Sequence, residues 1–242
     1  MTTLTKIIVS TLFTFLLFSC DFNMNLSPGI SGNGNVVTVD RTVEGNFNKI
    51  EVSRGMDVYL TQSDTETIEV EADENLQDII VTEIKDNVLK IYADQNIRQS
   101  KSQKVFVNFR SVSSISSSSG SDVYSTNTIA AESLELSTSS GSDMELNVNT
   151  ERINCSSSSG SDLKLSGKTN TLYAEASSGS DIKAGSLDAV TSHVKASSGA
   201  DITVNTSKEL IAKASSGGDI KYYGNPEKID KSDGVSGSIS KQ

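Results

Sequence analysis

The sequence contains no tryptophan, two prolines and few aromatic residues, which make up 5% of its 242 positions. Without tryptophan it lacks the residue best suited to a sugar-stacking groove. A hydrophobic fraction of 35% is low for a conventional globular core. The 17 glycines show no period of three, which excludes a collagen-like chain. Serine is the commonest residue, so two options are left: disorder, or a repetitive β architecture that buries small side chains.

Positive charge is also scarce. Lysine and arginine number 21 against 31 aspartates and glutamates, the net charge is -10, and no basic cluster occurs. Nucleic acid is therefore excluded as a partner, because phosphate contacts supply most of that affinity. The chain has no nucleophile elbow, no HExxH, no Cys/His metal spacing and no phosphate loop. Its single histidine, His193, falls at an outward position of the repeat described below, so we expect a protein that is not an enzyme.

The first twenty residues carry a targeting signal. Lys6 and the amino terminus supply a weakly positive start, and residues 7–19 are apolar but too few to span a membrane. The segment Leu17-Phe18-Ser19-Cys20 resembles a bacterial lipobox, in which the signal is cut before the cysteine and its thiol is acylated. We expect residues 1–19 to be a lipoprotein signal peptide and Cys20 to anchor the protein to a membrane. An ordinary secretory signal that happens to end in cysteine is the alternative.

Two further features depend on that anchor. Residues 20–35 are polar and rich in glycine and asparagine, which predicts a flexible tether after the acylated cysteine. Cys155 is the only other cysteine and then has no disulfide partner. A free thiol in an exported protein is expected to be buried.

A short motif, Ser-Ser-Gly-x-Asp followed by an apolar residue, occurs six times, and its copies are separated by 18 to 21 residues. Six copies at this period indicate stacked structural units, each of which needs its neighbours to bury its apolar side. The motif glycines are Gly120, Gly141, Gly160, Gly179, Gly199 and Gly217. The motif aspartates are Asp122, Asp143, Asp162, Asp181, Asp201 and Asp219.

Apolar and polar residues alternate with a period of two on both sides of each motif glycine. Around Gly160, for example, Ile153 and Cys155 precede it while Leu163 and Leu165 follow it. This alternation indicates strands, and its repetition predicts an all-β fold, a right-handed parallel β-helix with about 19 residues per coil in the C-terminal half. The hand follows the rule for parallel crossovers. Each glycine is expected at a corner, with positive φ, where a Cβ would clash.

Stacking places the six motif aspartates in one row. Neighbouring carboxylates would repel each other by roughly 1 kcal/mol per pair in water, so the row needs hydrogen bonds, cations or solvent. One interpretation is a calcium ladder, because hard cations take carboxylate oxygens. The interpretation that the residue types favour is an Asx-type turn, in which each aspartate accepts a hydrogen bond from a backbone amide. Calcium is thus the only candidate cofactor, and the sequence commits to no metal site.

The flanking segments divide the rest of the chain. Residues 36–110 hold short β-branched segments and are expected to form a bulkier N-terminal half of the solenoid that closes one end. Within it Ser53–Val58 resembles a degenerate copy of the motif, and Glu74–Val81 predicts a helical turn. Residues 111–226 form the repeat, and residues 227–242 are expected to cap its far edge. An uncovered edge would allow pairing between chains, which leaves a homo-oligomer as an open alternative.

Several short motifs, taken in order and spacing, carry a family resemblance. They are Gly32–Asn35, Arg41 with Phe47, Ile50–Val52, Asp57–Leu60, the Ser-Gly repeats and Tyr223–Pro226. From about residue 34 to 225 the chain resembles the head GIN domain family of auto-transporter adhesins. The resemblance implies an exported β-helical protein of unknown activity, and many such relatives carry lipoprotein signals. The chain departs from the family pattern by having aspartate where others often have glycine in the repeat.

Together these observations predict a non-enzymatic lipoprotein of the cell envelope, held in the outer membrane and facing either the periplasm or the cell surface. Its acidic, serine-rich faces are expected to bind an unknown protein or glycan, which corresponds to an adhesive role. Two alternatives stay open: a structural scaffold lipoprotein of the periplasm, and a β-helical carbohydrate-active enzyme.

Overall fold

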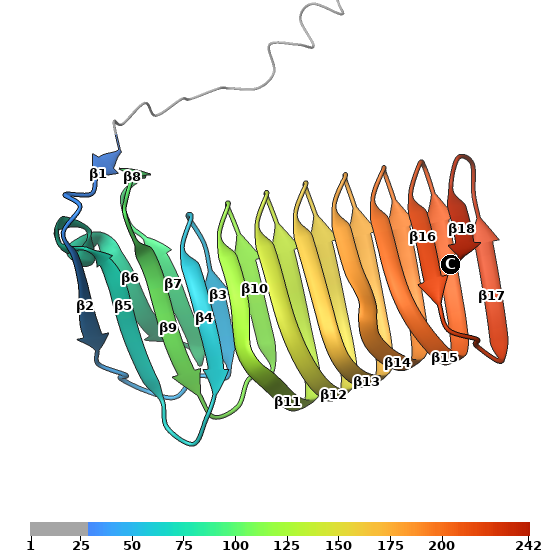
Figure 1. Ribbon diagram of the computed structural model, residues 1–242, viewed down its shortest axis with the longest axis horizontal. Helices are drawn as coiled ribbons and strands as arrows, with labels where there is room; N and C mark the ends of the chain where they lie inside the picture. Colours follow the sequence, from blue (N-terminus) through green and yellow to red (C-terminus); the bar gives the residue numbers. More distant parts are fainter. Residues whose placement is uncertain (1–28) are drawn as a thin grey trace, which may run out of the picture.

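The computed structural model describes residues 29–242. The expected signal peptide, the acylation site Cys20 and the first part of the expected tether lie outside these residues. Within the described part, no helix is long and apolar enough to cross a membrane. The chain forms a parallel β-solenoid whose N-terminal end is closed by a cap of mixed strands, as Figure 1 shows.

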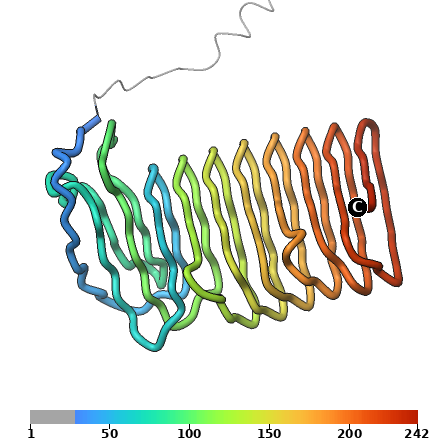
Figure 2. The backbone as a smooth tube through the Cα atoms, in the orientation of Figure 1, coloured from blue at the N-terminus to red at the C-terminus, as the bar shows by residue number. Residues whose placement is uncertain are grey.

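The solenoid is built by the serine-rich repeat. Its strands are β10 (Ser114–Ser118), β11 (Asp122–Ser139), β12 (Asp143–Ser158), β13 (Asp162–Ser177), β14 (Asp181–Ser197), β15 (Asp201–Ser215) and β16 (Asp219–Tyr223). Each of β11 to β15 runs along one side of the rod, bends and returns along the other side, and the motif forms the tight turn to the next strand (Figures 1 and 2). Successive strands pair in parallel, so that Asp143 lies beside Asp162 and Cys155 beside Ala174. The parallel β-helix expected from the repeat is confirmed.

Each coil therefore contributes to two sheets that face each other across the core. We name the side that begins at each motif aspartate the aspartate sheet, and the side that leads up to each motif glycine the return sheet. Inward side chains of the aspartate sheet are fully buried, for example Leu163 and Ile182. Next to the turn the two sheets converge, and there the inward residues are small: Ser117, Thr138, Ser157, Ala176, Ala196 and Ala214. Small residues near the turn follow from this narrowing, because larger side chains would not fit.

The motif turn has two consecutive residues in the left-handed region. The motif glycines have φ between 67° and 76°, and the serine before each glycine has φ between 52° and 58°. Positive φ at both central residues is the requirement of a type I′ turn. The expected clash of a Cβ is wrong, because a Cβ added at Gly120, Gly141, Gly160, Gly179 or Gly199 meets no atom within 4 Å. Backbone conformation selects glycine here, and crowding does not.

Buried serines connect the turns of successive coils. The hydroxyl of Ser180 accepts a hydrogen bond from the backbone N–H of Ser177 at 3.2 Å. The same oxygen lies 2.8 Å from the carbonyl oxygens of Ser177 and of Ser157, the latter in the preceding coil. A buried hydroxyl in this position leaves neither its own polar groups nor the turn's backbone unpaired.

The cap at the N-terminal end combines parallel layers of the solenoid with antiparallel strands. Its elements are β2 (Val36–Arg41), β3 (Lys49–Val52), β4 (Asp57–Gln62), β5 (Thr67–Asp73), a 3₁₀ helix η1 (Glu74–Ile79), β6 (Ile80–Lys85), β7 (Val88–Ala93) and β9 (Gln103–Phe109). Strands β2, β5 and β9 pair antiparallel, as do β6 and β7. Strands β3 and β4 form a coil with the turn between them, and β7 and β9 pair with them in parallel on the cap side. The expected helical turn is confirmed as η1.

The coil of β3 and β4 is the degenerate copy of the motif. Arg54 and Gly55 have φ of 61° and 75°, like the serine and glycine of the other turns. Asp57 pairs with Asp122, so the copy stands in register with the repeat. This coil lies between β7 and β9 on the cap side and β10 and β11 on the repeat side. The chain thus leaves its first coil, builds the cap on the outer side of that coil, and returns to continue the solenoid.

The last part of the expected tether is packed on the cap. Strand β1 (Ile30–Ser31) pairs with β8 (Ile97–Gln99). The buried carboxylate of Asp73 accepts hydrogen bonds from the backbone N–H groups of Lys101 at 2.7 Å, Ser102 at 3.2 Å, and Gly34. Burial alone would raise the pKa of Asp73, but these three donors hold that pKa below its usual range. Residues 30–35 are therefore not a free tether.

The C-terminal segment adds one more coil. Strands β17 (Lys228–Asp233) and β18 (Ser238–Lys241) pair in parallel with β15 and β16. All six residues of β17 are exposed, and four of them are charged: Lys228, Asp230, Lys231 and Asp233. Charges on a terminal strand disfavour edge-to-edge pairing with another chain.

Replacement of a turn glycine tests the role of its positive φ. We expect Gly160→Val to destabilise the fold by about 1–3 kcal/mol, because a β-branched residue is strained in the left-handed region. In a domain of this size that corresponds to a loss of roughly 3–8 °C in melting temperature, measured by circular dichroism. Gly160→Asn is the matched control and should lose less, since asparagine tolerates this conformation. An unchanged melting temperature for the valine variant would contradict this account of the turn.

Candidate functional site

The six motif aspartates lie in one row along the edge of the aspartate sheet, and the structure adds a seventh. The paired positions run from Asp57 through Asp122 to Asp219, one carboxylate per coil. We refer to these seven residues as the aspartate row. Asp57 was identifiable from the sequence only through the degenerate motif that contains it.

The row is electrostatically unfavourable. The pKa values of Asp57, Asp143 and Asp201 are raised, first by partial burial and second by the neighbouring aspartates. Lysine relieves part of the repulsion. The Nζ of Lys183 lies 2.6 Å from an oxygen of Asp162 and 3.5 Å from an oxygen of Asp181.

The hydrogen bonds of the turn involve the serine before each aspartate. The hydroxyls of Ser142, Ser161 and Ser180 accept the backbone N–H of the residue three positions earlier. In these three turns the serine hydroxyl accepts the kind of backbone hydrogen bond that was expected for aspartate. The carboxylates are spread one to a coil, and in residues 29–242 no three side chains from His, Cys, Asp and Glu come together as a metal site.

A short stack of aromatic rings lies beside the aspartate row at the cap end. The ring of Tyr59 stacks between those of Phe106 and Tyr124, with centroid distances of 5.2 and 5.4 Å. Partial burial, together with Asp122 and Asp57, raises the pKa of Tyr124 to about 12. The same outward column continues with charged residues, where Glu145 and Lys164 form an ion pair of 2.8 Å.

The return sheet holds the histidine and the cysteine. His193 faces outward and stacks on Tyr173, with ring centroids 4.8 Å apart. Cys155 is buried and free, as predicted, and burial raises the pKa of its thiol to about 12. A thiol with that pKa is protonated at neutral pH and is a poor nucleophile. Cys155 therefore offers no nucleophile, and the ring of His193 packs against an aromatic side chain.

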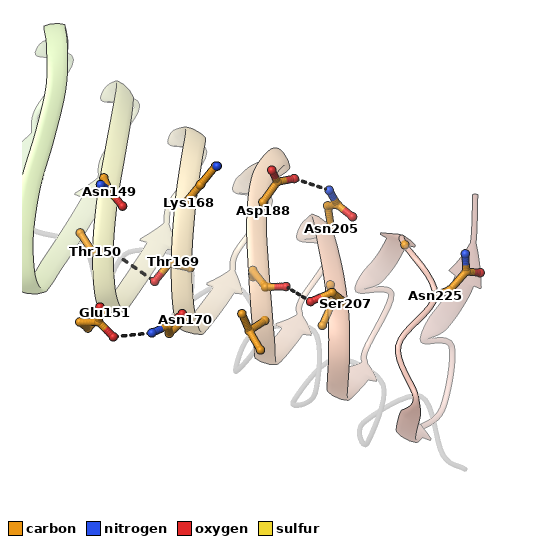
Figure 3. Close-up of a pocket in the computed structure, with 14 residues that line it drawn as sticks. Asn149, Thr150, Glu151, Lys168, Thr169, Asn170, Asp188, Asn205, Ser207 and Asn225 are labelled. Carbon is orange, nitrogen blue, oxygen red and sulfur yellow. Dashed lines mark hydrogen bonds between the residues drawn. The ribbon is translucent and has the colours of Figure 1, made fainter.

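A groove lies at the bend, where the strands pass from the aspartate sheet to the return sheet (Figure 3). We name it the bend groove. Five successive coils contribute to it, from β12 to the segment after β16, and its volume is about 620 Å³. Exposed side chains on its walls include Asn149, Lys168, Asp188 and Asn225.

The floor of the bend groove consists of buried small residues. Thr150, Thr169 and Thr206 are at most 6% exposed, and the hydroxyl of Thr150 donates to that of Thr169 at 3.0 Å. This groove was not predicted from the sequence, because the prediction rested on the columns that repeat. The wall column does not repeat: it reads Ala130, Asn149, Lys168, Asp188 and Asn205 along the rod. That change of chemistry from coil to coil was the available signal.

Comparison with known proteins agrees with this geometry. Residues 46–226 match the model of the family described as putative auto-transporter adhesin, head GIN domain. The chain belongs to the head GIN domain family. No curated protein matches the sequence of this head GIN domain protein.

Solved structures share the fold of this head GIN domain chain. A putative adhesin from Bacteroides fragilis NCTC 9343 has a TM-score of 0.82 at 24% identity, over 88% of this chain and 100% of that chain. A putative lipid binding protein from Parabacteroides distasonis ATCC 8503 has a TM-score of 0.72 at 22% identity, over 88% and 99%. A putative adhesin from Parabacteroides merdae ATCC 43184 has a TM-score of 0.68 at 18% identity, over 87% and 98%. At these identities the likeness shows the fold alone.

Neutralising one member of the aspartate row should stabilise this head GIN domain. A raised pKa means that the folded state favours the protonated carboxyl, so the stabilising contribution is complete below the unfolded pKa near 4 and is lost as the pH rises through the folded pKa. We therefore expect Asp143→Asn at pH 7 to raise the melting temperature by about 1–2 °C at low salt, from the loss of repulsion of order 0.5 kcal/mol.

Salt provides the check on that cause. The gain should shrink in 0.5 M sodium chloride, because salt screens repulsion between exposed charges. Glu175→Gln is the matched control, since Glu175 is paired with Ser156 and Lys195 in its column and has no acidic neighbour there. Its removal should not raise the melting temperature. An Asp143→Asn variant that melts below the wild type at low salt would show that the carboxylate stabilises the fold.

Proposed function

We propose that this protein is an exported, lipid-anchored adhesin that binds a macromolecule or polymer at the cell surface and catalyses no reaction. The observation that carries the proposal is the form of its surface. A rigid rod of paired coils presents outward side chains in continuous columns, together with a groove that crosses five coils. An extended polymer can contact such a surface over many coils at once.

The position of the N-terminal segment supports an anchored role. Residues 30–35 are held on the cap by β8 and by Asp73, so the chain enters the rod at its capped end (Figure 1). Eight residues lie between Cys20 and Gly29. Fully extended, this segment spans at most about 30 Å between the two Cα atoms. An acyl anchor at Cys20 would thus keep the cap near the membrane, and the coils that form the bend groove lie at the other end.

The arrangement of reactive groups supports a non-enzymatic role. His193 stacks on a tyrosine at the surface, and Cys155 is a buried, protonated thiol. General acid–base or nucleophilic catalysis requires a base within hydrogen-bond reach of the group it activates. Within residues 29–242 neither His193 nor Cys155 has such a partner.

Surface exposure is the first test of the adhesive role. The turn around Val235 is suited to a protease tag, because the Val235 side chain is 89% exposed. We would insert the recognition sequence of a site-specific protease between Gly234 and Val235 and treat intact and lysed cells. The proposal expects cleavage on intact cells, with a soluble periplasmic protein carrying the same sequence as the leakage control. Cleavage only after lysis would contradict adhesion and favour the periplasmic scaffold.

The anchor has its own test. Cys20→Ser removes the only thiol that the expected lipobox would acylate, so we expect the variant to leave the membrane fraction and appear as soluble protein. Cys155→Ser is the matched control and should stay with membranes, since that thiol is buried in the solenoid. Persistence of processed Cys20→Ser in the membrane fraction would count against lipidation.

A further inference from the structure

We propose that the bend groove binds an uncharged polysaccharide strand, laid along the axis of the rod and held by hydrogen bonds to its hydroxyl groups. The inference rests on the adhesive role proposed above, and it names both the site and the class of ligand. A volume of about 620 Å³ lies in the range of small-molecule and oligosaccharide sites.

The groove has the shape of a polymer site. Its walls come from corresponding positions of successive coils, which are spaced at about 4.8 Å. That repeat is close to the length of one sugar ring in an extended chain, so consecutive sugars would meet equivalent positions of consecutive coils. Figure 3 shows Asn149, Lys168, Asp188, Asn205 and Asn225 following one another along this direction.

The side chains of the groove suit neutral hydroxyl groups. Asparagine amides provide donors and acceptors together, and four of them line the site: Asn149, Asn170, Asn205 and Asn225. The charged lining residues are Glu151, Asp188 and Lys168, which sum to one negative charge. A polyanion would meet that charge and the acidic surface of the protein, so it is disfavoured. The lining includes no aromatic residue, so binding depends on hydrogen bonds and not on ring stacking.

The groove is already organised for binding. The amide of Asn205 donates to Asp188 at 3.0 Å, and that of Asn170 donates to Glu151. On the floor, Thr206 donates to Ser192 at 2.7 Å. Side chains that are fixed before binding lose little conformational entropy when a ligand arrives. The side chains of Asn149 and Lys168 have no hydrogen-bond or ion-pair partner among the described residues, and they are free to contact a ligand.

A local irregularity of the repeat lies beside this site. On β14, Ala184 pairs with Val204 and Asp188 with Asn205, so the three residues between Ala184 and Asp188 have no partner on β15. Figure 2 shows the resulting kink in that coil. Bulges of this kind often lie beside binding sites, where they redirect side chains. The turn columns and the inward columns keep similar residue types from coil to coil, whereas the outward wall of the groove has a different residue in almost every coil.

A peptide strand is the less favoured occupant. Strand addition requires free backbone donors and acceptors at a sheet edge. Strands β12 to β15 are interior strands of the sheet, and outside the irregular positions of β14 and β15 their backbone groups at the groove are paired on both sides.

The test is calorimetric titration of the full-length protein in a detergent without a sugar headgroup. The probes are three neutral hexasaccharides, from chitin, cellulose and β-mannan, and one anionic hexasaccharide, hexagalacturonate. We expect at least one neutral probe to bind, and hexagalacturonate to bind at least about tenfold more weakly than that probe. Failure of all three neutral probes, or tighter binding of hexagalacturonate, would overturn the proposal.

Variants assign the binding to the groove. Asn149→Ala and Asn205→Ala should each weaken the neutral probe about fivefold, the effect of losing one hydrogen bond. Asn225→Ala, outside the paired strands, is the further variant should either of the others fail to fold. Asn154→Ala is the matched control, an exposed asparagine on the return sheet that should leave affinity unchanged. Equal affinity of the groove variants and the wild type would place the glycan elsewhere and overturn the proposal.

Failure of this site is distinguishable from failure of the adhesive role. Surface exposure together with no binding of any neutral probe would overturn the groove proposal and leave adhesion standing. Binding that depends on the groove, in a chain that is protected until lysis, would support the groove and overturn adhesion.

Discussion

Hydrogen bonding between successive coils determines the rest of this structure. A coil has no hydrophobic interior of its own: its backbone groups pair with the coil before and the coil after, and its apolar side chains meet those of its neighbours. Equivalent residues of successive coils therefore meet the same structural requirement. Residues near the turn must be small, residues at the turn must tolerate positive φ, and residues along the sheets alternate between buried and exposed. The serine-rich composition follows from these demands, because serine is small and its hydroxyl can satisfy a buried backbone group.

The in-register stacking of the coils also places like charges next to each other on the surface. Because the coils stand in register, a residue that suits the turn is placed directly beside its own copies. For aspartate the result is a row of like charges with raised pKa values, relieved in part by Lys183. For the aromatic residues near the cap, the same register yields stacked rings with favourable contacts. The same register thus produces repulsive contacts between aspartates and favourable contacts between aromatic rings, depending on the side chain that repeats.

The repeat made most of the solenoid predictable, because the period-two alternation around Gly160 and its equivalents indicates strands and its regular recurrence indicates that they stack. The buried Cys155 followed from the same columns. The strand pairing of the cap was harder to predict from the sequence, because short β-branched segments such as Ile68–Val70 suit antiparallel and parallel pairing equally. The turn hydrogen bond was assigned to aspartate, whereas in three turns the buried serine before the aspartate accepts a backbone N–H. The bend groove was missed, because it depends on a bulge in β14 and on residues that differ from coil to coil.

The first coil bears on how the molecule assembles. Strands β3 and β4 are synthesised early, yet they are enclosed between cap strands on one side and β10 and β11 on the other, as the 65-residue separation of Met56 and Ser121 illustrates. Contacts over such distances close slowly, whereas every later coil contacts mainly its immediate predecessor, about 19 residues away. We therefore expect the cap and its enclosed coil to form slowly, and the remaining coils to add to them more quickly, one after another.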